Sequence, residues 1–263
     1  MTALTQNDQE LLAAIRQLKL HGMAAAIENQ LSNEFAYSNV DFTERLMEAV
    51  QAQQDYARQR SYDNAIKKAN LPWDTTLEKF STFKNRGIPM QEYHSLAALK
   101  WVKAPVNLII IGKSGSGKSS LGSAIAENAI RNGCSAAFWK THDLLDTLVS
   151  FTDHKSYERM MKRLSKTQVL VLDDFLNGAV TRQRVDALYN VLVSRGKLPV
   201  VVCSQIRPEG FRALLIAGAE SRCSKNDLPM ASIDSIADRL THPAHLIEIT
   251  GGSMRELEDN RIA

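Results

Sequence analysis

Two patterns of apolar and polar positions divide the chain into a shorter first part and a longer second part. In the first part, apolar residues recur at helical spacing over residues 11–31 and again over residues 42–56, as in amphipathic helices. Asp41, followed three residues later by Glu44, has the arrangement of a capping box at the start of the second stretch. The pattern predicts a small helical domain over residues 1–70, whose size leaves it little core of its own. We expect this domain to serve DNA binding or self-association.

A short segment rich in helix breakers, residues 71–105, follows the helical domain. Pro72 and Pro89 interrupt any long helix within it, and Gly87 provides a further break. We interpret the segment as a connector that packs onto the domain that follows. The apolar residues expected to anchor it there are Leu77, Phe80 and Phe83.

From residue 106 onward, short apolar runs alternate with amphipathic stretches. The apolar runs, which are typical of buried strands, span residues 106–111, 135–139, 169–174, 199–203 and 245–250. The amphipathic stretches, which favour helices, span residues 119–132, 141–151, 157–164, 182–195 and 232–240. This alternation predicts an α/β domain over residues 106–263, with a doubly wound, mostly parallel five-stranded sheet that is covered by helices on both faces.

The composition excludes several classes of protein. With 44% hydrophobic residues among 263, the chain can build a sizeable core and is not intrinsically disordered. No apolar run approaches the roughly 18–20 residues that span a bilayer, and the N-terminal residues lack the pattern of a secretory signal. Cys134, Cys203 and Cys223 are widely spaced and form no metal-binding pattern. We therefore expect a cytoplasmic protein with reduced thiols and no membrane association.

The charge of the chain does not by itself indicate a partner. Its net charge of +3 is small, and it has no basic tail. DNA binding would therefore depend on local patches, or on several subunits that add their patches together. Two clusters of basic residues at helical spacing are compatible either with contacts to phosphates or with ordinary solvated helix faces. They consist of Arg58, Arg60, Lys67 and Lys68, and of Arg159, Lys162, Arg163 and Lys166.

The strongest chemical signal is the segment Gly-Lys-Ser-Gly-Ser-Gly-Lys-Ser at residues 112–119, the complete pattern of a phosphate-binding loop. It follows a predicted strand and opens a predicted helix, as that pattern requires. Its glycines allow backbone N–H groups to curl around a phosphate, and the helix N-terminus adds a positive dipole. Lys118 is predicted to reach the β- and γ-phosphates, and Ser119 to bind Mg²⁺. The residues expected to bind the nucleotide are Gly112, Lys113, Ser114, Gly115, Ser116, Gly117, Lys118, Ser119 and Ser120.

Carboxylates at the end of the strand predicted over residues 169–174 form the second signal. Because the carboxyl ends of parallel strands share one edge of the sheet, Asp173 and Asp174 are predicted to lie beside the phosphate-binding loop. Asp173 would hold the Mg²⁺ shell through water, and Asp174 would polarise an attacking water. Ser204 and Gln205 follow another strand. They are either ordinary polar residues at a strand exit or groups that orient the same water.

A cation that offsets charge on the transferred phosphoryl group is expected to come from a neighbouring subunit. Arg239 lies late on an amphipathic helix, from which it would project into the neighbour's site. Its spacing also allows it to pair with Asp234 or Asp238 as an ordinary surface residue. Arg195 and Arg222 are alternatives for the same role.

Five segments together resemble those of a known family. They are LLAAIRQLKLHGMAAAIENQL near the N-terminus, the phosphate-binding loop, VLVLDDF, SQIRPEGF and IADRLTHPAHLIEITGGSMR. The set resembles the IstB-like ATP-binding proteins, which are insertion-sequence transposition helpers related to the helicase loader DnaC and to the initiator clade of AAA+ ATPases. The resemblance implies a homo-oligomeric ATPase that uses ATP and Mg²⁺, binds duplex DNA and assists a partner transposase, with hydrolysis controlling disassembly.

Several residues acquire an expected role from this resemblance. Arg239 matches the family's arginine finger, and Arg255 matches a second late arginine, which we interpret as a nucleotide sensor. Ser204 and Gln205 fall at the first sensor position. Asp174 stands where many AAA+ proteins have glutamate, so the resemblance implies slow hydrolysis. Only about 13 residues follow the last predicted strand, and we therefore expect no C-terminal lid domain.

Other functions stay open beside this one. A helicase loader of the DnaC type would have a replicative helicase as its partner. A small-molecule kinase with the same loop would carry an arginine-rich lid for the acceptor and would transfer phosphate without DNA. A nucleotide-gated scaffold would bind ATP with almost no hydrolysis. A GTPase is disfavoured because the sequence has no Asn-Lys-x-Asp guanine motif.

Overall fold

The computed structural model describes residues 3–82, 86–178, 180–220 and 230–252. The chain divides into two compact units, residues 1–64 and residues 65–263, and the division lies within one long helix. No helix in the described ranges is both long enough and apolar enough to cross a membrane.

The first unit is helical, as the spacing of its apolar residues predicts. It consists of α1 (Gln6–Gln17), α2 (His21–Ser32), α3 (Glu34–Tyr37) and the first part of α4 (Phe42–Ala69). A capping box starts α1, because the Thr5 side chain accepts the Asp8 N–H and the Asp8 carboxylate accepts the Thr5 N–H. At the start of α4, the Asp41 carboxylate accepts the N–H of Thr43 at 2.9 Å. Local polar side chains thus begin both helices.

A five-stranded parallel sheet forms the centre of the second unit, with the strand order β2-β3-β4-β1-β5. The strands are β1 (Asn107–Gly112), β2 (Ala136–Lys140), β3 (Val169–Asp173), β4 (Val200–Ser204) and β5 (Ala244–Ile249). Each strand overlaps the apolar run that predicted it, so the doubly wound α/β fold is confirmed. Because β1 lies between β4 and β5, the loop that follows β1 emerges between the exits of these two strands.

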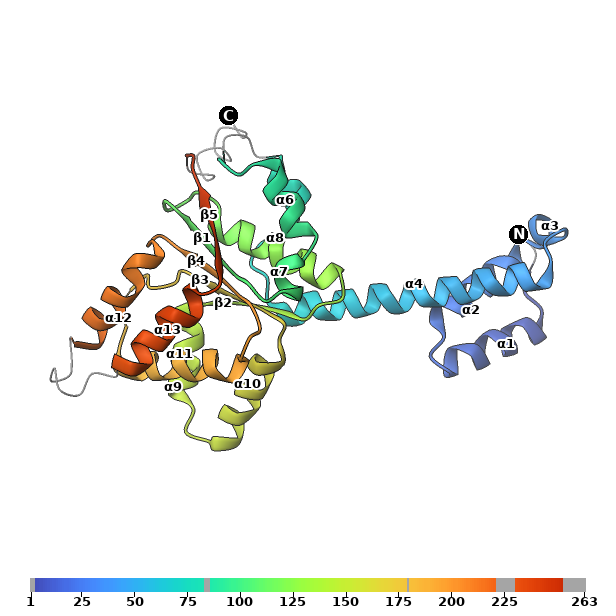
Figure 1. Ribbon diagram of the computed structural model, residues 1–263. Coiled ribbons are helices and arrows are strands. Elements are labelled where there is room, and N and C mark those ends of the chain that lie inside the picture. The colour runs from blue at the N-terminus through green and yellow to red at the C-terminus, as the bar shows by residue number, and fades with distance from the viewer. Residues whose placement is uncertain (1–2, 83–85, 179, 221–229, 253–263) are drawn as a thin grey trace, which may run out of the picture. The chain divides into compact units, whose positions relative to one another are not determined.

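Helices cover both faces of the sheet, and successive strand residues point alternately to the two layers. Leu108 and Ile110 pack toward α8 (Lys118–Arg131), whereas Ile109 and Ile111 pack toward the other layer. That other layer contains α9 (Thr141–Ser150), α10 (His154–Lys166), α11 (Arg182–Arg195), α12 (Phe211–Glu220) and α13 (Met230–Thr241). Figure 1 shows the two layers on opposite sides of the strands. The helices predicted for this domain are confirmed, whereas α12 is an additional one.

The connector is more ordered than its breakers predict. It forms three short helices, which are α5 (Leu77–Ser81), α6 (Met90–Ala97) and α7 (Lys100–Lys103). Leu77 and Phe80 are buried in the same core as α8, which confirms their predicted role as anchors. Phe83, the third predicted anchor, lies outside the described residues. The breakers therefore separate short helices from one another and do not prevent them from forming.

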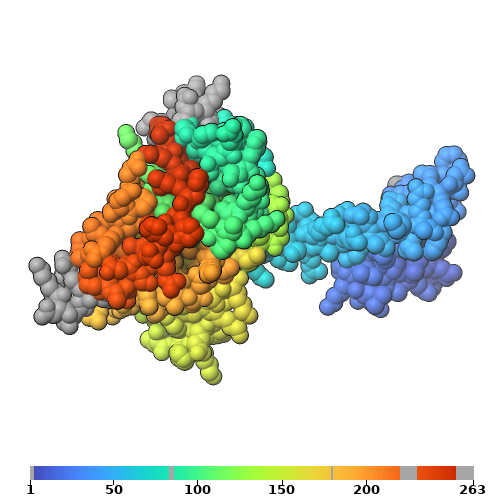
Figure 2. All heavy atoms as spheres, in the orientation of Figure 1, coloured from blue at the N-terminus to red at the C-terminus, as the bar shows by residue number. Residues whose placement is uncertain are grey.

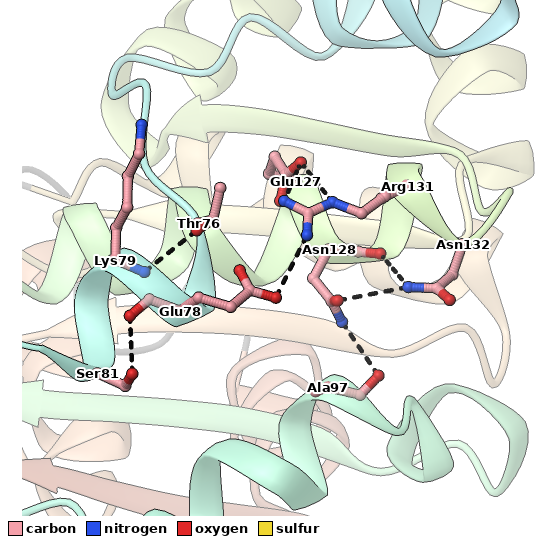
Figure 3. A network of polar contacts seen from close by, with 9 residues as sticks. All are labelled: Thr76, Glu78, Lys79, Ser81, Ala97, Glu127, Asn128, Arg131 and Asn132. Carbon is pink, nitrogen blue, oxygen red and sulfur yellow. Dashed lines mark hydrogen bonds and ion pairs between the residues drawn. The ribbon is translucent and has the colours of Figure 1, made fainter. Parts of the chain in front are cut away.

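Polar contacts also join the connector to α8 (Figure 3). Arg131 of α8 pairs with Glu127 at 2.9 Å on its own helix and with Glu78 of α5 at 3.3 Å. Asn128 donates to the main-chain oxygen of Ala97, at the end of α6, at 3.3 Å. Since α8 begins at the phosphate-binding loop, these contacts help to fix the helix that carries the loop.

The strand β5 lies at an edge of the sheet and is partly exposed. Figure 2 shows β5 and α13 as a red band at the surface, between the orange α12 region and the green connector helices. His245, Leu246 and Glu248 of this strand are exposed, whereas Ile247 and Ile249 are buried. The exit of β5 is therefore accessible beside the exit of β1.

Candidate functional site

The loop between β1 and α8 has a tight curl that depends on glycine, as Gly112 and Gly117 show. Gly117 has a φ of 99°, in the left-handed region that favours glycine. A Cβ atom at Gly112 would lie 2.6 Å from Ser116 Oγ and 2.8 Å from the main-chain oxygen of Ile249. The N–H of Ser116 donates to the oxygen of Lys113 at 3.2 Å and holds the curl. The loop is thus a narrow cradle that fits a phosphate bound by backbone N–H groups.

Lys118 lies inside this cradle. It is buried, and its Nζ donates to the main-chain oxygens of Gly112 at 2.9 Å and Lys113 at 2.8 Å. Desolvation lowers the pKa of Lys118, and the nearby Cys203, Asp174 and Asp173 act in the opposite direction. An ammonium has three N–H donors, so one remains beyond the two bonds to the loop.

Ser119 and Asp173 form a pair of hard oxygen ligands beside the loop. Ser119 Oγ donates to Asp173 Oδ1 at 2.9 Å, and Thr141 Oγ1 donates to the main-chain oxygen of Asp173 at 2.8 Å. A hydroxyl and a carboxylate are oxygen donors of the kind that Mg²⁺ prefers, so the pair fits this ion, with Ser119 as a ligand and Asp173 holding a bound water. Burial raises the pKa of Asp173, although the hydrogen bond from Ser119 lowers it. Among the described residues, no group of three His, Cys, Asp or Glu side chains forms a metal site.

Asp174 follows directly in a strained backbone turn. Its φ of 50° is in the left-handed region, which costs a non-glycine residue of order 1–3 kcal/mol. The N–H of Phe175 donates to the oxygen of Cys203 at 2.9 Å, and the buried Phe175 ring packs against Phe211. These contacts hold the turn, and they keep Asp174 half-buried near the loop.

Ser204 and Gln205, predicted as a pair, lie in different surroundings. Ser204 is fully buried, and its hydroxyl donates to the oxygen of Phe175 at 2.8 Å and accepts the N–H of Ile206 at 3.1 Å. It therefore ties the exit of β4 to the exit of β3. Gln205 is exposed and lines a hollow at the mouth of the loop, together with Gly112 and other loop residues. Of the two, Gln205 is the one whose side chain is available at the loop.

Arg239 lies at the end of the sheet where β1 begins, opposite to the end that carries the loop. The Asn107 side chain, at the start of β1, donates to the main-chain oxygen of Arg239 at 2.7 Å. The loop begins at Gly112, the last residue of β1, and at a rise of about 3.3 Å per residue the two ends of this strand lie about 16 Å apart. The Arg239 guanidinium donates only to Ser235 Oγ, at 3.2 Å, among the described residues. It lines a cavity of about 550 Å³ together with Lys197.

The acidic residues considered as surface partners of Arg239 have other partners. Asp234 pairs with Arg212 at 2.6 Å, and Asp238 lies 3.5 Å from His242. Within the described ranges, no carboxylate forms an ion pair with Arg239. Its guanidinium therefore remains available to a group outside this chain.

The alternatives to Arg239 have different positions. Arg195 is buried, and its guanidinium donates to the main-chain oxygens of Leu164, Thr167, Gln168 and Pro199. Desolvation lowers its pKa to about 10. Arg195 thus fastens α10 and α11 to the sheet and does not point toward a ligand. Arg222, and also Arg255 and Cys223, lie outside the described residues.

Two arginines at the loop, Arg86 and Arg207, were not predicted from the sequence. Arg86, in the connector, is buried and donates from Nη1 to the main-chain oxygens of Ser116 at 3.1 Å and Gly252 at 2.9 Å. Arg207, beyond β4, lines the same hollow as Gln205 and pairs with Glu248 at 2.7 Å. The only local signals were that Arg86 precedes a glycine and that Arg207 precedes a proline, and neither indicates a contact with a distant loop.

The second basic cluster lies on α10. Arg159, Lys162, Arg163 and Lys166 are exposed, whereas Tyr157, Met160, Met161 and Leu164 pack against the core. Arg163 donates to the main-chain oxygen of Lys68 at 2.8 Å, and the hydrogen bonds of Arg159 to described residues lie within its own helix. α10 is therefore amphipathic, with a basic outer face. Of the first cluster, Arg58 forms an exposed pair with Asp55 at 3.4 Å.

Comparisons with known proteins give the family of the chain and agree with its fold. The family model described as IstB-like ATP binding protein matches residues 13–261. A relative from Pseudomonas aeruginosa, named for ATP binding in insertion sequence IS21, is 28% identical over 253 residues, which cover 96% of this chain and 91% of the relative. The crystal structure of DnaI has a TM-score of 0.51 at 21% identity, covering 68% of this chain and 90% of DnaI. That of the DnaC helicase loader has a TM-score of 0.51 at 17% identity, covering 68% of this chain and 98% of DnaC.

Proposed function

The chain belongs to the family of IstB-like ATP binding proteins, and from this premise we propose that it is an ATPase that assembles on duplex DNA and assists a transposase. Hydrolysis of ATP between adjacent copies would control disassembly. One observation carries the proposal: among the described residues Arg239 has no carboxylate partner, only a hydrogen bond to Ser235, and it lies at the end of the sheet opposite the loop. A site that needs this cation is completed only by a second copy of the chain.

Within one copy, the loop residues would hold the phosphates of ATP. The N–H groups of residues 113–119 and the ammonium of Lys118 supply the donors. Ser119 and Asp173 would hold Mg²⁺, which neutralises charge on the phosphate oxygens when it is bound. Asp174 would polarise the attacking water, and Gln205 would orient it. Because the side chain of Asp174 is shorter than that of glutamate, we expect slow turnover by a single copy.

The role of Asp173 leads to a prediction about Mg²⁺. We expect Asp173→Asn to remove most of the increase in ATP affinity that Mg²⁺ causes, because an amide is a poorer ligand than a carboxylate. Burial raises the pKa of Asp173, so folding disfavours its charged form, and the neutral variant should melt no lower than the parent. Titration calorimetry with and without Mg²⁺ measures the effect, with Asp146→Asn, an exposed aspartate paired with Arg184, as the control. An undiminished Mg²⁺ effect in Asp173→Asn would contradict the assignment.

Assembly would also supply the affinity for DNA. The basic face of α10 is exposed, but the net charge of one copy is only +3. A single copy would therefore contact few phosphates, whereas several copies side by side on one duplex add their contacts. We propose that nucleotide promotes this arrangement because it bridges the loop of one copy and Arg239 of the next.

Experiments can distinguish the alternative functions from the proposed one. A small-molecule kinase would transfer phosphate to its acceptor without DNA. A helicase loader would bind a replicative helicase, and the fold likeness to DnaC is compatible with that partner. The relative named for insertion sequence IS21 matches over nearly the whole chain and favours the transposase.

Electron microscopy of the protein with duplex DNA tests the proposal. We expect a ring or spiral on the DNA with a non-hydrolysable ATP analogue, and separate copies without nucleotide. ADP in place of the analogue provides the matched control, and we expect it to give much less assembly. If the protein stays monomeric on DNA with the analogue, the proposed assembly is wrong.

A further inference from the structure

We propose that Arg207 binds the terminal phosphate of the nucleotide in its own copy, and that Glu248 holds Arg207 when this phosphate is absent. Exchange of the arginine between these two anions would let the site distinguish ATP from ADP. The inference rests on the proposed function only in that it takes ATP as the ligand of the loop. It adds a phosphate contact within the same copy, separate from the one that Arg239 would supply.

Strand register brings the two residues to the mouth of the loop. Ile111 of β1 is the partner of Ser204 in β4 on one side and of Glu248 in β5 on the other. Arg207 follows shortly after Ser204, and the loop begins at Gly112. The exits of three adjacent strands therefore meet where the loop starts.

One hollow joins these exits. It has a volume of about 320 Å³ and is lined by Ile111, Gly112, Lys113, Ser114, Gln205, Arg207 and Glu248. A ligand that occupies it beside the loop lies within reach of both the arginine and the carboxylate. Because no described ion pair other than the one with Glu248 engages Arg207, its guanidinium has a single competitor.

The ion pair is of a kind that a phosphate can replace. Arg207 Nη2 donates to both carboxylate oxygens of Glu248 at 2.7 Å, so a single nitrogen makes both bonds. The side chains are 57% and 47% exposed, and ion pairs that are this open to water contribute little stability. Arginine binds phosphate through two parallel N–H groups, which is a stronger arrangement. A phosphate in the hollow would therefore draw Arg207 from Glu248.

The terminal phosphate is the one that this arrangement selects. In sites of this kind Mg²⁺ links the β- and γ-phosphates to the serine of the loop and to an aspartate that ends another strand, so the γ-phosphate lies on the side of that strand. Here that strand is β3, which pairs with β4, and Arg207 lies just beyond the exit of β4. The phosphates shared by ATP and ADP would lie in the loop itself, with Lys118. With ADP, Arg207 would keep its bond to Glu248.

The affinities for ATP and ADP, measured without DNA, test the inference. We expect Arg207→Ala to weaken binding of a non-hydrolysable ATP analogue by about tenfold or more, the scale of a lost hydrogen bond between charged groups. ADP affinity should change by less than about twofold, because an exposed ion pair contributes little. Glu248→Gln should act in the opposite direction and strengthen binding of the analogue, since it frees Arg207 and removes a negative charge. Titration calorimetry gives both affinities.

Two further variants separate this inference from its premise. Arg212→Ala removes an exposed arginine that pairs with Asp234 away from the loop, and we expect both affinities to stay at the parental values. If the parent binds neither nucleotide, the proposed function is wrong. If it binds both and Arg207→Ala leaves the ratio of the two affinities unchanged, only the role of Arg207 is wrong. A fold defect in Arg207→Ala cannot explain tighter binding by Glu248→Gln, so that second variant keeps the test decisive.

Discussion

Lys118→Ala is expected to abolish binding of both ATP and ADP, with a loss of affinity of about a hundredfold or more, the upper range for a hydrogen bond to a charged group. The Lys118 ammonium bridges the main-chain oxygens of Gly112 and Lys113 and is the cation at the centre of the loop. Without it, the loop presents two carbonyl oxygens where the phosphates would lie. Titration calorimetry with each nucleotide measures the loss.

A loss of fold would not mimic this result. Lys118→Ala gives up a buried side chain and two hydrogen bonds to the loop, so it should melt lower than the parent but still in one cooperative transition, which shows that the variant is folded. Lys140→Ala is a matched control, because Lys140 is exposed at the end of β2, on the same edge of the sheet. If Lys118→Ala keeps the parental affinities, the loop is not the nucleotide site.

Arg239→Ala should leave the affinity of a single copy for ATP unchanged and should slow hydrolysis in the DNA-assembled state. An arginine supplied by a neighbouring subunit typically accelerates hydrolysis by about 10³–10⁵-fold, and a loss on that scale is expected. The affinity of a single copy should not change because Arg239 lies at the end of the sheet opposite the loop of its own copy. Phosphate release in the presence of duplex DNA measures the rate.

A mixture of two variants tests whether the arginine acts between copies. Lys118→Ala alone lacks the loop cation, and Arg239→Ala alone lacks the proposed neighbour's cation. In an equimolar mixture, some copies of Arg239→Ala would face an intact Arg239, so part of the hydrolysis should return. Arg212→Ala, which removes another exposed arginine of the same helical layer, is the control. Hydrolysis by assembled Arg239→Ala at the parental rate would refute this role.

The phosphate-binding loop and the strands could be predicted from the sequence, because each is defined by residues that follow one another in the chain. The loop at residues 112–119 binds phosphate through consecutive N–H groups, so its pattern is written in consecutive residues. The strands were predictable because each contains a short apolar run, and the three central strands β1, β3 and β4 are buried on both faces. Asp173 could be predicted to lie at the loop because the carboxyl ends of parallel strands lie at the same end of the sheet. Helix α12 was not predicted, and neither were the connector helices, because breakers surround them.

Contacts between distant parts of the chain were decided only by the tertiary structure. Arg86 contacts Ser116 across 30 positions, and Arg207 contacts Glu248 across 41. Neither contact follows from local spacing, because each depends on the order of strands in the sheet. The same holds for the burial of Arg195, which removes it as an alternative to Arg239.

The sequence by itself thus determined the chemistry of one half of the site, because that half is a loop and a strand end. The tertiary structure decided which cations accompany it. It placed Arg207 beside the loop and Arg239 on the far edge, since β1 lies between β4 and β5 and α13 ends where β1 begins. Strand order is a property of the whole fold, and no period or motif along the chain encodes it.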